Sequence, residues 1–287
     1  MTTAPHASPR TAQPAVPQEE PRPRFADLVA AEWIKLRSLR STWIAHGAAA
    51  LAVTGLNAGT AYDTYAHWEE RTPADRAAFV RAGLPLQEAF TVNAAVVTTV
   101  ALCVLGALPL LGEFATGALR TTFTAVPARS AVTGAKAVVV AGFATAWGAL
   151  VTVVSFLLTQ AILDGRGVGI ALDGPGVPRV LLASTLLAPV CALTGLALAA
   201  ALRRTAATVL ASVTAVMVLP LLLGEDRYWT ALARHALLLA AWLRLTAPGG
   251  SAPPPYPWTE AGAWTVYAVW ATAAVSVTVL AVRRRDV

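Results

Sequence analysis

The sequence carries little charge. Asp, Glu, Lys and Arg make up 13% of its 287 residues, whereas an ordinary soluble domain has about a quarter. So few charged residues are not enough to cover the water-exposed surface of a soluble protein of this size. In addition, 56% of the residues are hydrophobic, and the mean hydropathy is +0.59. The same apolar excess excludes disorder for most of the chain. The composition therefore predicts an integral membrane protein, whose solvent over most of its area is lipid.

Cysteine and lysine are also scarce. The two cysteines, Cys103 and Cys191, exclude a disulfide scaffold and lie in apolar runs, where a thiol acts as a small hydrophobe. Only Lys35 and Lys136 among the 22 basic residues are lysines, and the arginines are scattered at the ends of apolar runs. A nucleic-acid-binding protein would instead cluster its basic residues on one face beside stacking aromatics. We therefore expect no nucleic-acid partner.

Motifs for catalysis are missing as well. The sequence contains no GxxxxGK[ST] phosphate loop, no HExxH and no CxxC, and its four histidines lie far apart. The chain therefore shows no nucleotide-binding or catalytic motif, and we expect neither an enzyme nor a bound cofactor or metal. A rival hypothesis, a membrane-embedded enzyme, would have to use His46, Asn57 or Asn93.

Six runs without Asp, Glu, Lys or Arg are long enough to span a bilayer, which takes about 20 residues. They are residues 42–61, 92–112, 137–163, 180–202, 205–224 and 261–282. The absence of an acid from all six also disfavours an ion-coupled carrier, which usually has an intramembrane carboxylate. If the chain moves a substrate uphill, we expect the energy to come from a partner protein.

The charges between the runs predict the orientation. With the N-terminus inside, the cytoplasmic segments hold 14 of the 22 basic residues, and the first outer loop holds five acids against three arginines. We therefore expect both termini to be cytoplasmic. Residues 1–24 contain six prolines and no apolar run, which predicts a disordered cytoplasmic tail, and residues 25–287 form the six-span domain.

The segment 25–40, just before the first run, has an imperfect amphipathic pattern. Most of its apolar residues fall on one helix face, but Glu32 and Arg40 intrude on that face. Its aromatic and basic residues, Trp33, Lys35 and Arg37, suit a helix lying on the inner leaflet. The alternative is a simple basic anchor that fixes topology.

The inner loop after the second run is the second non-spanning segment. If it continues as a helix, Glu113, Gly117 and Arg120 share one face, which would suit docking against another protein. The alternative is that Glu113 and Arg120 only cap a membrane helix and reach to water.

Two further segments have plainer interpretations. The apolar stretch 231–245 is too short to span comfortably, which predicts an interfacial or re-entrant helix. The terminal Arg283-Arg284-Arg285-Asp286 is most simply a stop-transfer anchor.

These segments together resemble one family. The motif Glu32-Trp33-Ile34-Lys35-Leu36-Arg37-Ser38 before the first run is similar to a motif of bacterial ABC exporter permeases of the second type. The stretch 112–127, with Gly112-Glu113 and Thr116 to Thr122, resembles that family's loop after its second helix, and the terminal arginines are also common there. The likeness covers about residue 25 to the C-terminus, in order.

The resemblance implies an all-α permease subunit of the bacterial plasma membrane. Two permease chains, as a homodimer, would pair in the bilayer above two cytoplasmic ATP-binding-cassette ATPase subunits. The segment 25–40 would be an interfacial connecting helix. The segment 113–127 would be a coupling helix, with Glu113, Gly117, Arg120 and Phe123 as its coupling residues. The remaining rival is a non-transporting membrane partner, such as an immunity or sensor-associated protein.

Overall fold

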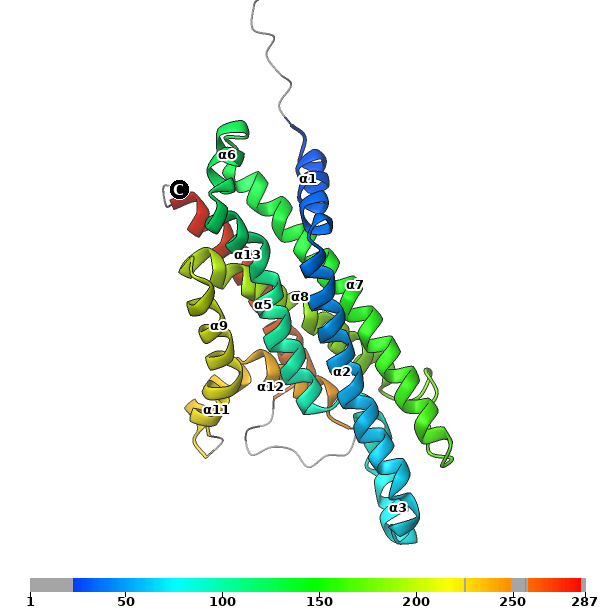
Figure 1. Cartoon of the computed structure of the whole chain (residues 1–287). Helices are drawn as coiled ribbons and strands as arrows, with labels where there is room; N and C mark the ends of the chain where they lie inside the picture. The colour runs from blue at the N-terminus through cyan, green and yellow to red at the C-terminus, as the bar shows by residue number, and fades with distance from the viewer. Residues whose placement is uncertain (1–22, 225, 249–255, 257, 285–287) are drawn as a thin grey trace, which may run out of the picture.

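A computed structural model describes residues 23–224, 226–248, 256 and 258–284. These residues form helices joined by short connections and contain no β-strand, which confirms the all-α prediction. The long helices run roughly alongside one another in an elongated bundle, as Figure 1 shows. The predicted tail lies almost wholly outside the described residues, as do Arg285 and Asp286 of the terminal charge run.

The helices follow one another along the chain as α1 (Phe25–Ser38), α2 (Arg40–Ala66), η1 (Trp68–Glu70), α3 (Pro73–Arg81), α4 (Leu84–Glu88), α5 (Val92–Thr116), α6 (Ala118–Ala125), α7 (Arg129–Asp164), α8 (Val177–Leu202), α9 (Thr205–Val213), η2 (Thr214–Val218), α10 (Leu219–Leu222), α11 (Tyr228–His235), α12 (Leu238–Thr246) and α13 (Glu260–Arg284).

Five helical segments of the described chain are long and apolar enough to cross a membrane. They are Leu84–Thr116, Arg129–Asp164, Val177–Leu202, Thr205–Leu222 and Glu260–Arg283. They contain four of the six predicted runs in full and all but the last two residues of a fifth, 205–224. The first run, 42–61, lies in α2, which is 27 residues long but is not among the five. The polar residues His46 and Asn57, with several threonines and glycines, lower the hydropathy of that helix.

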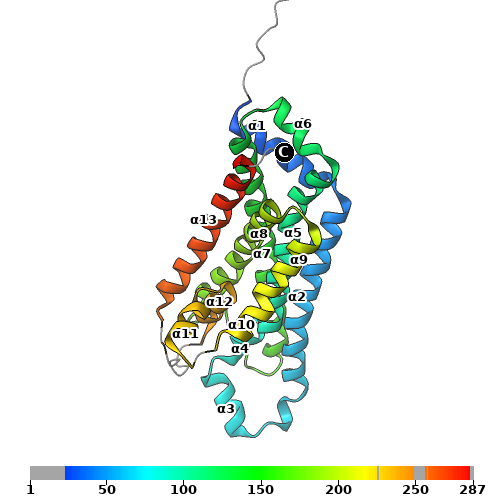
Figure 2. The same cartoon turned by 90° about the vertical axis from the view of Figure 1, so that its left-hand side faces the viewer.

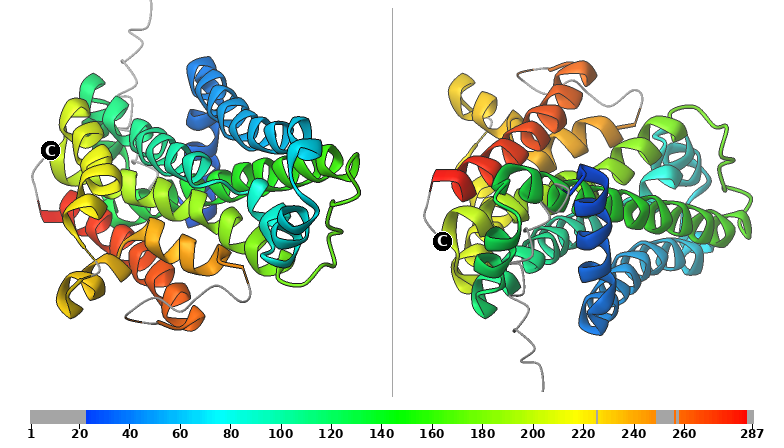
Figure 3. Two further views of the ribbon diagram at one scale, coloured as in Figure 1. Left: turned by 90° about the horizontal axis from the view of Figure 1, so that it is seen from below. Right: turned by 90° about the horizontal axis from the view of Figure 1, so that it is seen from above.

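Helix α8 occupies the centre of the bundle. It packs against α5, α7 and α13, and Figure 3 shows it between them when the molecule is seen along its length. Glycines make these close contacts possible: a Cβ at Gly148 of α7 would lie 2.5 Å from the carbonyl oxygen of Thr185 in α8. A Cβ at Gly195 of α8 would lie 2.6 Å from the carbonyl carbon of Cys103 in α5. Lipid-embedded helices often pack through such small residues.

The run 205–224 is an interrupted helix. Its middle part, η2, is a π-helix, in which the amide of Leu219 donates to the carbonyl of Thr214. Pro220 explains the interruption, because its ring has no N–H and would clash with the carbonyl four residues earlier in a regular α-helix. This segment lies at the periphery, where most of its apolar side chains are not covered by the chain itself.

The stretch 231–245 differs from the single helix that the sequence predicts. It forms parts of two short helices, α11 and α12, which are separated at Ala236 and Leu237. Helix α12 packs against α8 and α13, and its Trp242 is buried and donates to Ser184 Oγ at 3.1 Å. It is therefore part of the packed bundle and not merely a surface helix.

The two ends of the bundle differ in composition. Helices α1 and α6 and the C-terminal end of α13 gather at one end, while η1 and α3 of the first predicted outer loop lie at the other (Figures 1 and 2). Six exposed arginines belong to segments of the α1/α6 end, namely Arg24, Arg37, Arg40, Arg120, Arg204 and Arg283. We call this the basic end.

Candidate functional site

Four charged side chains meet near the basic end. Glu32 and Lys35 come from α1, Glu113 from the last turn of α5, and Lys136 from the second turn of α7. We call them the charge cluster. They include both lysines of the chain, and segments as far apart as 104 residues bring them together.

The two lysines of the charge cluster bridge the same two carboxylates. Lys136 Nζ donates to Glu32 Oε2 and, at 2.9 Å, to Glu113 Oε1. Lys35 Nζ donates to Glu32 Oε1 at 2.6 Å and to Glu113 Oε1 at 2.9 Å. The side chain of Lys136 is 3% exposed and that of Glu32 5%, whereas Lys35 is 44% exposed. The cluster is thus electrically balanced, with its innermost pair shielded from solvent.

Local sequence signals place these residues. Leu39 adopts an extended conformation between α1 and α2, so that α1 turns away from α2 and packs on α7. Glu113 follows Pro109 by one turn, near the end of α5. Gly117 then ends α5 in the left-handed conformation, at a φ of 71°, which glycine adopts at no steric cost. These breaks bring α1, the end of α5 and the start of α7 to a common point.

The electrostatics of Lys35 reflect this arrangement. Its partial burial by itself lowers the pKa of the ammonium group, but the hydrogen bonds from Lys35 to Glu32 and Glu113 outweigh that effect. The net pKa of Lys35 is therefore raised above its ordinary value of 10.5, and the group stays charged at neutral pH. Glu113 Oε2 is buried and has no hydrogen-bond partner among the described residues.

The predicted coupling residues separate into two groups. Because α5 ends at Thr116 and α6 begins at Ala118, Glu113 and Arg120 do not share a face of one continuous helix. Glu113 is buried in the charge cluster, whereas Arg120 is exposed on α6. Phe123 is buried under α6, and the Arg129 guanidinium lies over its ring at 5.4 Å. Of the four, Arg120 and Gly117 are exposed at the surface.

The residues predicted for the interfacial helix also take different positions. Lys35 belongs to the charge cluster, Arg37 is exposed, and the partly exposed Trp33 lies 6.3 Å from the Phe143 ring of α7. The residues that α1 buries are Leu36 and Glu32. Glu32, the acid predicted to lie on the apolar face, is thus one of the two buried residues of the helix, because Lys136 and Lys35 neutralise it.

Glu32 and Lys136 are the residues that sequence reasoning missed as partners. Two signals could have found them: a carboxylate on the apolar face of a helix, and a lysine in a chain that otherwise uses arginine. A buried ammonium is easier to accommodate at Lys136 than a guanidinium, because it is compact and its three donors can rotate.

A cavity of about 540 Å³ adjoins the charge cluster. It is formed by α1, the start of α2, the C-terminal half of α5, α6 and α7. All four members of the charge cluster line it, together with hydroxyl groups and apolar side chains. We call it the inner cavity.

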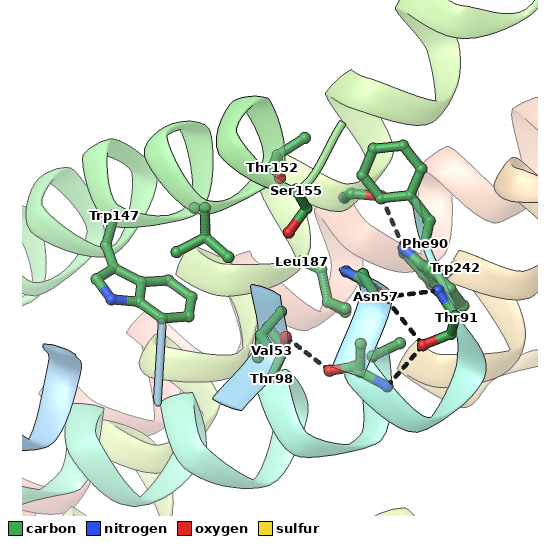
Figure 4. A pocket seen from close by; sticks show the side chains of 15 residues that line it. Val53, Asn57, Phe90, Thr91, Thr98, Trp147, Thr152, Ser155, Leu187 and Trp242 are labelled. Atoms are coloured by element: carbon green, nitrogen blue, oxygen red, sulfur yellow. Dashed lines mark hydrogen bonds between the residues drawn. The ribbon is translucent and has the colours of Figure 1, made fainter. Parts of the chain in front are cut away.

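A second, much smaller pocket of about 30 Å³ lies nearer the opposite end, among α2, α5, α7, α8 and α12 (Figure 4). Its best-defined polar contact is Asn57, whose Oδ1 accepts hydrogen bonds from Thr91 N at 3.1 Å and Thr91 Oγ1 at 2.9 Å. Ser155 Oγ, which also lines it, is buried without a partner. This volume accommodates about one water molecule.

The three residues of the membrane-enzyme hypothesis do not form a site. His46 packs against Phe143 and bonds the carbonyl of Thr42, while Asn57 lies three turns further along the same helix. Asn93 is exposed at the start of α5. Within the described part of the chain, no group of three or more His, Cys, Asp or Glu residues is placed to hold a metal ion.

Comparison of the sequence with protein-family models gives no match, and comparison with curated proteins gives none either.

Proposed function

We propose that the chain is the membrane-spanning permease subunit of an ATP-driven ABC exporter of the second type. The observation that carries the proposal is the charge cluster, which ties α1, α5 and α7 together directly beside α6. A short helix seated on such a junction can transmit a displacement to three long helices at once. This is the mechanical property that a coupling helix requires.

The exposed surface of α6 supports docking by a partner. Leu119 and Phe123, four residues apart, hold α6 to the bundle, so that Arg120, Thr121 and Thr124 are exposed. A guanidinium flanked by hydroxyl groups suits an acidic or carbonyl-lined groove on a cytoplasmic ATPase subunit. In this proposal, ATP binding closes the ATPase dimer, and α6 carries the movement to the charge cluster and the spans. ATP must then bind the ATPase more tightly when the membrane helices are in one packing than when they are in the other.

The proposal includes α2 as the sixth span. At 27 residues it is about 40 Å long, which exceeds the ~30 Å hydrocarbon core. Its exposed side chains include Ile44 and Leu51, which suit contact with lipid. Six spans with the basic end inside place both termini in the cytoplasm of a bacterial cell, by the positive-inside rule. A second copy of the chain completes the membrane part as a homodimer.

The test is a pull-down of the tagged full-length chain from its native membranes in a mild detergent, followed by mass spectrometry. We expect a stoichiometric partner with a phosphate-binding loop. Arg120→Ala should insert normally into the membrane but retain less of this partner and stimulate its ATPase activity less. Arg81→Ala, an exposed arginine on α3 at the opposite end, is the matched control and should behave as wild type.

Two outcomes would contradict the proposal. The first is recovery of the chain alone or only as an oligomer of itself, although ATP-binding-cassette ATPase subunits are detected in the same lysate. That result would indicate a stand-alone membrane protein. A stable ATPase complex that gives no ATP-dependent flux in vesicles would indicate a non-transporting immunity or sensor-associated partner.

A further inference from the structure

The inner cavity is large and partly polar, and its hydrogen-bonding groups restrict the kind of ligand that fits it. Four of its hydroxyl groups already donate to backbone carbonyls of their own helices, at 2.8 to 2.9 Å: those of Ser38, Thr116, Thr121 and Thr122. A hydroxyl has one donor and two acceptor positions. These four groups therefore offer a ligand only acceptor lone pairs.

The carboxylates of Glu32 and Glu113 also line the inner cavity, and an ionised carboxylate is an acceptor only. One oxygen of Glu113 has no hydrogen-bond partner among the described residues, although the protein covers it from solvent. The lysine donors, by contrast, are largely committed to the two carboxylates, since Lys35 and Lys136 each make two such hydrogen bonds. A ligand group rich in donors therefore fits the polar part of the cavity, and a primary ammonium, with three N–H donors, is the simplest such group.

The rest of the cavity lining is apolar, and basic residues lie in the adjoining segment. Leu39, Leu108 and Val139 are three of the apolar lining residues, and each lies near one end of a predicted apolar run. The half-exposed Lys35 and the exposed Arg37 and Arg40 lie in the adjoining segment of α1 and α2. A positively charged surround disfavours a ligand with a net positive charge and favours one that also carries a phosphate.

We infer that the inner cavity binds the head group of an aminophospholipid from the inner leaflet. The primary ammonium lies among the hydroxyl and carboxylate acceptors, the phosphate faces the basic residues of α1 and α2, and the acyl chains extend along the apolar side. The balanced charge cluster does not repel such a zwitterion. The inference goes beyond the proposed function, because a lipid site here would exist whether or not the chain transports.

The test uses the purified full-length chain in detergent, with binding measured by native mass spectrometry and thermal shift. The probes are dioleoyl phosphatidylethanolamine, phosphatidylcholine and phosphatidylglycerol. Phosphatidylcholine keeps the phosphate but has no N–H donor. We expect the ethanolamine lipid to bind about tenfold or more tightly than either of the others, the factor typical of a hydrogen bond to a charged group.

Matched variants locate the site. The double variant Thr121→Val/Thr122→Val removes two acceptors from the inner cavity and should abolish most of the preference for ethanolamine. Thr124→Val removes a similar hydroxyl from α6, which also donates to a backbone carbonyl but does not line the cavity, and should leave the preference intact. None of these changes touches the charge cluster, so that folding, checked by melting temperature, should be preserved.

Two simpler probes test whether the cavity recognises the whole lipid or only one part of it. Dodecylamine supplies an amphiphilic ammonium without phosphate, and glycerophosphoethanolamine supplies the head group without acyl chains. We expect both to bind more weakly than the lipid. Equal binding of the ethanolamine and choline lipids, a preference for phosphatidylglycerol, or dodecylamine binding as tightly as the lipid would each overturn the inference.

Discussion

Replacing Lys136 by methionine is the sharpest test of the charge cluster. The substitution keeps a long, unbranched side chain but removes the ammonium that donates to both Glu32 and Glu113. Two carboxylates then remain with Lys35 as their single cation, and the cluster acquires one uncompensated negative charge. The side chains involved are 3%, 5% and 11% exposed, so solvent cannot take over the missing interaction.

The expected magnitude follows from that burial. Removing one partner of a buried ion pair costs about 3–5 kcal/mol, because the other charge stays buried and unpaired. At about 2–4 °C per kcal/mol, the melting temperature should fall by roughly 6–20 °C. The double variant Glu32→Gln/Lys136→Met leaves the neutral pair Lys35–Glu113, which is joined at 2.9 Å. It should therefore be more stable than Lys136→Met by about 1 kcal/mol or more.

The assay is intrinsic-fluorescence melting of the purified variants in one mild detergent. Arg37→Met, an exposed cation on α1, is the control and should change stability by less than about 0.5 kcal/mol. The reasoning is refuted if Lys136→Met melts with the control. It is equally refuted if the stability lost by the double variant equals the sum of the losses measured for Lys136→Met and Glu32→Gln separately, since the two side chains would then be energetically independent.

Two further predictions concern packing and pH. Gly148→Ala should destabilise the chain by about 1–3 kcal/mol, because its Cβ would lie 2.5 Å from a backbone oxygen of α8. Gly142→Ala on the same helix, whose Cβ would have nothing within 4 Å, should be neutral or slightly stabilising. Equal melting temperatures of the two variants would contradict this prediction. The hydrogen bond from the His67 ring to the backbone carbonyl of Asp63, aided by the Asp63 carboxylate, raises the pKa of His67 above 6.5. Because the pKa of His67 is higher in the folded state, its protonation stabilises the fold fully at a pH below its unfolded-state pKa. This stabilisation is lost as the pH rises through the folded-state pKa. NMR titration of the His67 ring should give a midpoint above 6.5, and Asp63→Asn should lower that midpoint.

Much of the fold follows from the sequence. Length and hydropathy predict six candidate spans, since spanning a bilayer demands about 20 apolar residues in a row, and five of them correspond to helices long and apolar enough to cross a membrane. The helix breaks at Gly117 and Pro220 also have local causes, because one residue favours a left-handed backbone and the other lacks an N–H, although the pattern of Glu113, Gly117 and Arg120 predicted a helix that continues through Gly117. Such features require no knowledge of what packs against the segment.

The details of the stretch 231–245 could not be predicted in the same way. Its length excluded a span, but the division into α11 and α12 and the burial of Trp242 depend on α8 and α13. A short apolar helix has the same pattern whether it lies on lipid or among other helices. The environment therefore decided its position.

The candidate site shows most clearly which features the sequence determines and which depend on the tertiary structure. The sequence by itself determined that this is a helical, membrane-type chain with a polar segment before its first apolar run and another after its second, because hydropathy and helix breakers act over a few residues. Only the tertiary structure decided that Glu32 and Glu113 share Lys35 and Lys136, and that a cavity opens beside them. Charges so far apart in the chain reveal their pairing only when the backbone brings them within hydrogen-bonding distance, since electrostatic partners are selected by position in space and not by order in sequence.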